Sequence, residues 1–462
     1  MSVLCFDISS GGVSAALFSP KLELIKLIED KWELAPGETG APTLSMATVA
    51  ERFKMVVQGL ALTKAPDAIC IGSFMHNCVL LDSGDGPLTP VFTWLDGRGG
   101  KGLAYLRNRL GDRFHEHTGC RFHPAFPVFK LATLYVEGSS QLKKMRRVVS
   151  VKAFLMHRLT GAWAEDHGMA SASGLYNTQT GGWDPAVMGL VGLNAENLPP
   201  ILDRTAIAGR VTLGGSREFG LPEGSPVAVG SGDGFLAHVG SDCENLSRLS
   251  ASLGASAAVR QSLPAPLFDS SAGTFCYQAD RTTYVLGCAG SNGGNVLDWG
   301  RSIFGEPEEV VGRGLPIFIP LLHGERSPEW NAELAGSWHG LKALHTPADL
   351  ARSVIEGVVF NLGRYVEILQ STSGEKASGV VLSGNGFLQR FAPSTLAAVA
   401  GIPVWRPSDP GLASLRGAGV CALRAIGSPV PKLHLDPVAP LEDEKILERY
   451  NAYKRLRVRD HQ

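Results

Sequence analysis

PVAVGSGDGFLAHVG, residues 226–240, joins an apolar run to a helix-like run through a turn in which three glycines surround one acid, Asp233. Glycines let a backbone and a ligand approach each other closely. An Asp at a strand-to-helix turn can accept the proton of a hydroxyl that attacks a phosphate. It can also cap the helix that follows. The stretch alone therefore leaves two interpretations of Asp233 open, a catalytic base and a helix cap.

Around this turn, the two halves of the chain repeat one pattern. Residues 3–8 and 13–19 are strand-like and flank a Gly/Ser turn at 9–12, and residues 249–260 again combine apolar runs with a small-residue turn. Helix-like segments follow in both halves. A length of 462 residues suits two domains. The pattern predicts an α/β fold of two similar domains with a ligand cleft between them.

The composition excludes several classes of protein. Hydrophobic residues make up 44%, charged residues 19%, and the net charge is −1 without a Lys/Arg block, which argues against a nucleic-acid or membrane partner. The eight cysteines show no C-x-x-C spacing, so we expect reduced core thiols rather than a zinc site or disulfides. The N-terminus lacks a signal-peptide pattern, and no apolar run approaches 18 residues. The expected location is the cytoplasm.

Two small-residue turns could bind phosphate. Residues 252–256 lie between two apolar stretches, and residues 9–12 follow Asp7, which could hold Mg²⁺ through water. The backbone N–H groups of such turns can bind phosphate oxygens. Both segments are equally compatible with plain hairpin turns. A Walker G-x-x-x-x-G-K-[ST] motif is absent from the sequence, which excludes a P-loop.

A third cluster could bind a sugar. Trp94, Asp96 and Arg98 follow the pair Met75-His76 by some twenty residues. A Trp face stacks on sugar C–H groups, while Asp and Arg bond hydroxyls or a carboxylate. The alternative is a surface ion pair beside a buried Trp.

In this order, the clusters resemble the FGGY family of carbohydrate kinases over nearly the whole chain, from Asp7 to about Ala425. The resemblance implies two ribonuclease-H-like domains of the actin, hexokinase and heat-shock-70 type, expected at residues 1–244 and 245–435, with a helical tail at 436–462. It implies that a sugar binds deep in the cleft, that MgATP binds mainly to the second domain, and that domain closure joins the two.

The resemblance also implies roles for the acids and the sugar cluster. Asp233 matches the family's general base, and Asp7 and Asp233 together would hold Mg²⁺ through water. The W-x-D-x-R segment of Trp94, Asp96 and Arg98 matches the sugar site. Met75-His76 matches the M-H pair beside the substrate.

ATP would bind the two turns and an adenosine motif, through Ser9, Ser10, Gly11, Gly254, Ala255, Ser256, Gly384 and Asn385. These segments depart from the family pattern. Ser14 stands where a basic residue is common, and Ala255 lacks the hydroxyl of the usual G-T-S turn. One lost hydrogen bond to a charged phosphate costs about 1.5–3 kcal/mol, so we expect weakened ATP binding without loss of turnover.

Within the family, the chain is most similar to gluconate kinases. Residues 118–124, 166–177, 292–294 and 324–331 resemble motifs of that group. This similarity implies phosphorylation of D-gluconate to 6-phosphogluconate, with Arg98 meeting the carboxylate. Sedoheptulose and xylulose kinases are the close alternative. A sugar-binding sensor or partner subunit without phosphoryl transfer is the alternative of another class, and a homodimer stays open.

Overall fold

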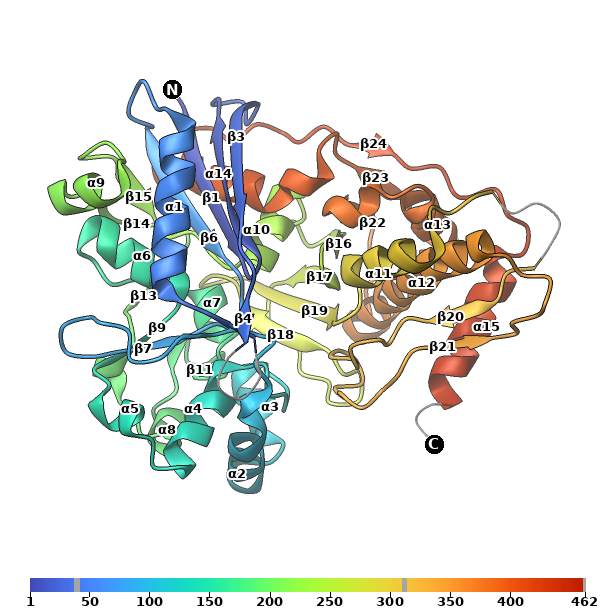
Figure 1. Cartoon of the computed structure of the whole chain (residues 1–462), viewed down its shortest axis with the longest axis horizontal. Helices are drawn as coiled ribbons and strands as arrows, with labels where there is room; N and C mark the ends of the chain where they lie inside the picture. The colour runs from blue at the N-terminus through green and yellow to red at the C-terminus, as the bar shows by residue number, and fades with distance from the viewer. Residues whose placement is uncertain (37–41, 310–313, 460–462) are drawn as a thin grey trace.

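The computed structural model describes residues 1–36, 42–309 and 314–459, which form two domains, each built on a mixed sheet (Figure 1). The first sheet has the order β14-β15-β6-β1-β2-β3. Its strands are β1 (Val3–Ser9), β2 (Gly12–Phe18), β3 (Leu24–Lys31), β6 (Ala68–Ser73), β14 (Ile207–Arg210) and β15 (Pro226–Ala228). The helices α1 (Met46–Leu60), α6 (Val151–Thr160) and α9 (Leu213–Phe219) belong to this domain. The predicted hairpin over residues 3–19 is confirmed.

The second sheet has the order β18-β19-β17-β16-β22-β23-β24. Its strands are β16 (Arg248–Leu253), β17 (Ala257–Leu263), β18 (Phe275–Gln278), β19 (Tyr284–Gly290), β22 (Gly379–Ser383), β23 (Val404–Arg406) and β24 (Asp436–Pro437). The long helix α12 (Pro347–Ser373) contacts β17 and β19. It starts at a capping box in which Thr346 and Asp349 satisfy each other's backbone N–H groups, with Pro347 at the first helical position.

The two sheets share one topology. β1 pairs antiparallel with β2 and parallel with β6, and β16 pairs antiparallel with β17 and parallel with β22. The turn between β1 and β2 is thus equivalent to the turn between β16 and β17. The repeat predicted from the sequence is confirmed, and both candidate phosphate turns are tips of equivalent hairpins.

The remaining elements form insertions and edges around the two sheets. In the first domain they are β4 (Ala35–Pro36), β5 (Pro42–Leu44), β7 (Val79–Leu81), β8 (Val91–Phe92), η1 (Gly97–Gly99), α2 (Gly100–Leu110), α3 (Arg113–Thr118), α4 (Pro127–Val136), α5 (Ser140–Lys144), β9 (Arg147–Val149), β10 (Glu165–Asp166), α7 (His167–Ser171), β11 (Tyr176–Asn177), β12 (Gly182–Trp183), α8 (Pro185–Leu190), η2 (Ala195–Asn197) and β13 (Ile201–Leu202). In the second they are α11 (Gly294–Phe304), β20 (Ile317–Ile319), β21 (Ser337–His339), η3 (Asn385–Leu388), α13 (Ala392–Val399) and η4 (Pro410–Leu412).

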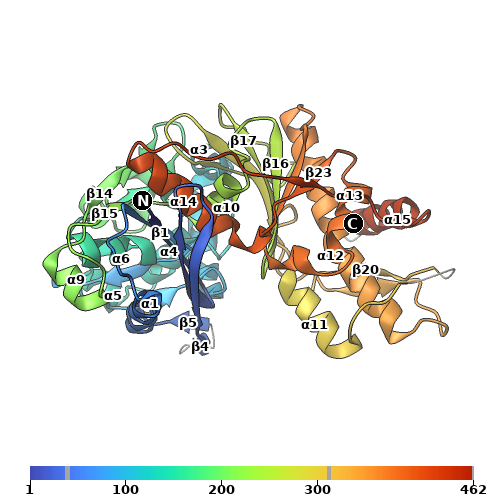
Figure 2. The same cartoon turned by 90° about the horizontal axis from the view of Figure 1, so that it is seen from above.

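Two helices connect the domains, α10 (Asp233–Gly240) and α14 (Ala413–Ala425), and they pack on each other (Figures 1 and 2). α14 comes late in the chain, yet it packs on the first sheet, where Cys421 belongs to one buried cluster with Cys5 and Cys70. Leu4, Phe6 and Ile8 belong to a separate core cluster with α1. Strand β1 is therefore buried on both faces, which explains its nearly continuous apolar run.

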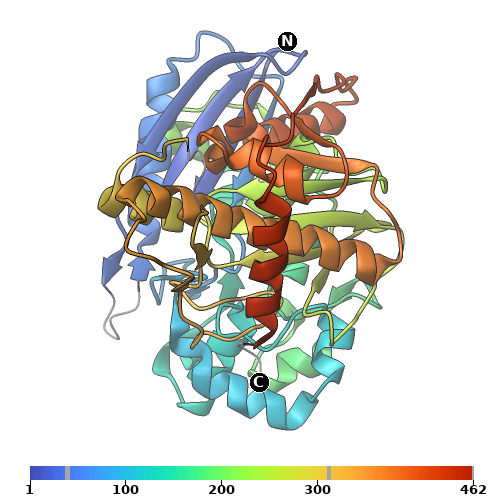
Figure 3. The same cartoon turned by 90° about the vertical axis from the view of Figure 1, so that its right-hand side faces the viewer.

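The chain ends on helix α15 (Ile446–Arg459), which lies across α12 (Figure 3). Ile446, Tyr450 and Tyr453 belong to the core of the second domain. We therefore propose that the segment expected as a separate tail is part of that domain. The boundaries expected at residues 244 and 435 stay predictions. Among the described helices, none combines the length and the apolar character that crossing a membrane requires.

The buried His238 on α10 predicts a pH dependence of stability. Its Nδ1 lies 2.7 Å from Ser250 Oγ and its Nε2 2.9 Å from Ser262 Oγ. Burial lowers the pKa of His238 from 6.5 to about 3. Between these two values the unfolded chain binds a proton that the folded chain does not. The stabilisation from His238 is therefore complete above pH 6.5 and is lost as the pH falls toward 3.

The unfolding free energy of the wild type should fall when the pH is lowered from 7.5 to 5. We expect this fall to be smaller by about 2 kcal/mol in His238→Gln, because one pKa unit corresponds to about 1.4 kcal/mol. Urea unfolding at the two pH values measures it. His434→Gln, at an exposed position, is the control that keeps the wild-type difference. An unchanged difference in the His238 variant would contradict the assignment.

Candidate active site

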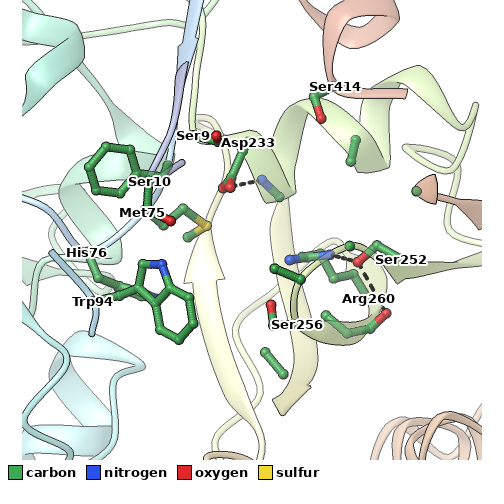
Figure 4. Close-up of a pocket in the computed structure, with 18 of the residues that line it drawn as sticks. Ser9, Ser10, Met75, His76, Trp94, Asp233, Ser252, Ser256, Arg260 and Ser414 are labelled. Atoms are coloured by element: carbon green, nitrogen blue, oxygen red, sulfur yellow. Dashed lines mark hydrogen bonds between the residues drawn. The ribbon is translucent and has the colours of Figure 1, made fainter. Parts of the chain in front are cut away.

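A cavity of about 290 Å³ lies between the domains and is lined by residues of both (Figure 4). Many of the predicted site residues line it: Ser9, Ser10, Met75, His76, Trp94, Asp233, Gly254, Ala255, Ser256 and Gly384. Asp7, Gly11, Asp96, Arg98 and Asn385 are outside this lining. Segments far apart in the sequence therefore meet at one cavity, with the equivalent hairpin tips on its wall.

Asp233 is the first residue of α10, and Gly232 takes the N-cap position. Its Oδ1 accepts a hydrogen bond from the Gly234 N–H at 2.7 Å. Burial raises the pKa of Asp233, while the charge of Arg260 opposes the shift. The carboxylate faces the cavity in Figure 4. A partly desolvated carboxylate in this position can accept a proton from a bound hydroxyl.

A buried network holds the turn that carries Asp233. Lys152 Nζ lies 3.0 Å from Glu165 Oε1 and 2.7 Å from Asp166 Oδ1, and it donates to the carbonyl of Val229. Ser231 Oγ donates to Asp166 Oδ2 at 2.5 Å. Burial would lower the pKa of Lys152, but the two acids raise it to about 12. The network therefore connects the turn to α6 and β10.

Asp7 lies in the second half of β1, close enough to Asp233 for the two charges to interact. Burial, and then the charge of Asp233, raise the pKa of Asp7 to about 7. Its Oδ1 is buried without a hydrogen-bond partner, whereas the side chain of Ser414 bonds the carboxylate. Two neighbouring carboxylates, one with an unpartnered oxygen, fit a divalent cation, since Mg²⁺ is usually bound by one or two carboxylates, water and phosphate oxygens.

The second small-residue turn is tightly supported. Gly254 N donates to Ser256 O, and Gly294 N donates to Gly254 O at 2.7 Å. A side chain at Gly293 or Gly294 would collide with the backbone of this turn. The glycines of the 292–294 segment thus let α11 approach the turn. Gly384, with φ of +93°, approaches the Leu253 carbonyl closely.

His76 is neutral and oriented. Burial lowers the pKa of His76 to about 3, and Nδ1 lies 2.8 Å from the Ala172 carbonyl. A carbonyl only accepts hydrogen bonds, so Nδ1 carries the proton and Nε2 is left as an acceptor. The residue has φ of +61°, a sparsely populated conformation that such sites tend to hold.

The structure does not bring Asp96 and Arg98 to the cavity wall. Asp96 is fully buried, caps η1 by accepting from the Arg98 N–H, and pairs with Arg98 Nε at 2.7 Å. The guanidinium of Arg98 lies 4.3 Å from the centroid of Phe92. The ion pair of the partly exposed Arg98 with the buried Asp96 organises the segment after Trp94, and the expected contact of Arg98 with a substrate carboxylate stays a prediction.

Two arginines that were not among the predicted site residues line the cavity, Arg260 on β17 and Arg326 in the loop after β20. The guanidinium of Arg326 lies 5.1 Å from the centroid of Trp94, and its Nη2 donates to the Gly290 carbonyl at 2.7 Å. Its Nε is buried without a partner. Arg326 stands inside the 324–331 motif, and Arg260 is a charge in an otherwise uncharged strand. The motif around Arg326 and the single charge of the β17 segment could both be seen in the sequence, but neither showed that the arginine side chain faces a cavity.

The profile of the FGGY family of carbohydrate kinases, N-terminal domain, matches residues 3–240, and that of the C-terminal domain matches residues 249–426. The chain belongs to this family. The gluconokinase of Bacillus licheniformis is 27% identical over 390 residues, 78% of this chain and 75% of its own length. The xylulose kinase of Escherichia coli K12 is 26% identical over 403 residues, 84% of this chain and 82% of its own length.

The crystal structure of gluconate kinase from Lactobacillus acidophilus superposes with a TM-score of 0.90 at 24% identity, and the match covers 99% of this chain and 97% of that one. The two-domain α/β fold of the ribonuclease-H-like type is thereby confirmed. As a member of the FGGY family, the kinase is a phosphotransferase that uses ATP with Mg²⁺ and acts on a carbohydrate hydroxyl.

Proposed function

We propose that this kinase phosphorylates a terminal hydroxyl of an open-chain sugar acid, with D-gluconate the favoured substrate. The observation that carries the proposal is Arg326, a buried cation over the Trp94 ring in the cavity. An unpartnered Nε beside an aromatic face suits a ligand that combines a carboxylate with C–H surface. The gluconokinase relatives support the same substrate class.

Asp233 is the proposed base. Its carboxylate accepts the proton of the terminal hydroxyl while that oxygen forms a bond to the γ-phosphorus. The bond from this phosphorus to the β,γ-bridging oxygen breaks, and ADP leaves with the electron pair. Asp7 and Asp233 would hold Mg²⁺ through water. When bound, Mg²⁺ neutralises charge on the phosphate oxygens.

The other wall residues orient the two substrates. Trp94 would stack on the sugar, while the free Nε2 of His76 accepts a hydrogen bond from a hydroxyl and Met75 packs beside it. The turns at Ser9-Ser10 and at Ala255-Ser256 would offer N–H groups to the phosphates, while the Gly254 N–H supports the second turn. Gly384, with Asn385 packed against Gly411, lies on the proposed adenosine side.

A panel of sugars tests the substrate. We expect kcat/KM, measured by coupled ADP release, to be higher for D-gluconate than for D-xylulose or sedoheptulose. Faster turnover of either ketose would overturn the sugar-acid assignment and favour the ketose kinase, which the xylulose kinase relatives support at similar identity.

Arg326 can be tested separately. We expect Arg326→Gln to raise the KM for gluconate by about 10- to 150-fold, because a hydrogen bond to a charged group contributes about 1.5–3 kcal/mol. The neutral polyol D-glucitol should lose much less affinity. Arg390→Gln, at an exposed position outside the cavity, is the matched control and should keep the wild-type gluconate KM. Equal losses for gluconate and glucitol would show that Arg326 does not meet the carboxylate.

A further inference from the structure

Neither of the two phosphate turns carries a positively charged side chain that could pair with the transferred phosphoryl group. Ser14 stands where the family often carries a basic residue, and its Oγ donates to Glu29 Oε1 on the neighbouring strand. The second turn offers Ala255 and Ser256, neither of which is charged. Phosphoryl transfer spreads negative charge over the oxygens of the transferred group, so a cation there has a large effect on the rate.

Arg260 lies where such a cation is needed. Its strand, β17, starts directly after the phosphate turn, and its Nη1 donates to Ser252 Oγ at 3.0 Å. Its Nη2 faces Gly234, at which any Cβ would collide with it. Gly234 follows the proposed base, so the guanidinium reaches from the turn toward Asp233. Figure 4 shows Arg260 between Asp233 and the turn that carries Ser256.

The carboxylate of Asp233 acts on the charge of Arg260 without a direct ion pair between the two side chains. Among the described residues, no acid forms an ion pair with it, and the Ser252 contact leaves nitrogens of the guanidinium free. Burial lowers its pKa to about 10, so the group stays cationic at neutral pH. A half-buried cation on a cavity wall that forms no direct ion pair can bind an anion.

We propose that Arg260 binds the γ-phosphoryl group of ATP and stabilises it during transfer, in place of the basic residue and the hydroxyl that the phosphate turns lack. This rests on the proposed role of Asp233 as base but not on the identity of the sugar. Arg260 neither gains nor loses a proton in the step. Its N–H groups would donate to the oxygens of the phosphorus that the sugar oxygen attacks.

Binding of two nucleotides tests the proposal, because only ATP carries the γ-phosphate. We expect Arg260→Gln to weaken binding of the Mg²⁺ complex of the non-hydrolysable ATP analogue AMP-PNP by about 10- to 150-fold in calorimetry without sugar. MgADP should bind as in the wild type. The kcat with the best sugar should fall, with its KM nearly unchanged. Arg260→Lys keeps the positive charge but not the planar set of guanidinium N–H donors, and it should show a smaller loss of AMP-PNP binding.

The control is Arg248→Gln on the neighbouring strand β16, whose side chain pairs with Asp242 at 3.5 Å outside the cavity. It should leave both affinities unchanged. Equal losses for AMP-PNP and ADP in the Arg260 variants would overturn the proposal, as would unchanged AMP-PNP binding. A loss of gluconate affinity with AMP-PNP binding retained would overturn it too and assign Arg260 to the sugar carboxylate. If the Arg260 variants lose AMP-PNP binding as expected but the wild type turns over gluconate slowly, only the sugar assignment would be refuted.

Discussion

Replacing Asp233 by Asn is expected to lower kcat by about 10²–10⁴, the usual contribution of a positioned general base. Asn preserves the size of the side chain and can still accept from the Gly234 N–H, but it cannot take up the hydroxyl proton. Sugar binding should largely persist. Steady-state ADP release and sugar calorimetry measure the two effects separately.

Asp242→Asn is the matched control for this variant. It removes a carboxylate just beyond the C-terminal end of the same helix, at an exposed position. We expect it to keep wild-type kcat. An Asp233→Asn variant that retains more than a tenth of wild-type kcat would exclude Asp233 as the base.

Lys152→Met is expected to lower the free energy of unfolding by about 3–5 kcal/mol, because it leaves Glu165 and Asp166 buried without their cation. The Lys152 ammonium also bonds the carbonyl of Val229, which precedes the Asp233 turn. We therefore expect the folded variant to lose kcat as well, with less effect on sugar affinity. Urea unfolding and steady-state kinetics provide the two measurements.

The control for Lys152 is another Lys–Glu pair, Lys454 with Glu367 at 2.8 Å, which is partly exposed. Lys454→Met should cost less than about 1 kcal/mol, as surface ion pairs do. If both variants lose the same stability, the buried network does not hold the turn as proposed.

The fold could be predicted from the sequence because its signals are local. A hairpin is the expected structure of two apolar runs joined by a small-residue turn, and residues 3–18 form one. The expectation of helix-like segments in the second half is confirmed by α12, which begins at Pro347. The packing of α14 on the first sheet was not predicted, because it depends on a contact between Cys421 and strands about 350 or more residues earlier.

The candidate site could be predicted only in part. Trp94 and His76 have side chains suited to binding a sugar and lie in motifs that the sequence shows. Both line the cavity. Asp96 and Arg98 have equally suggestive chemistry, but their charges are used on each other, and spacing cannot show that. Arg260 belongs to no motif in the sequence. Its proposed role follows from the approach of β17 to the start of α10, a tertiary contact.

We propose that this kinase transfers the γ-phosphate of ATP to a terminal hydroxyl of a sugar acid bound in the cavity. The most direct measurement is ³¹P NMR of D-gluconate incubated with MgATP and the wild-type protein. We expect the γ-phosphate signal to disappear while the ADP signals and one phosphomonoester signal, coupled to a terminal CH₂, grow by equal amounts. Gluconate binding without any phosphomonoester or ADP would contradict it and identify a sugar-binding protein instead.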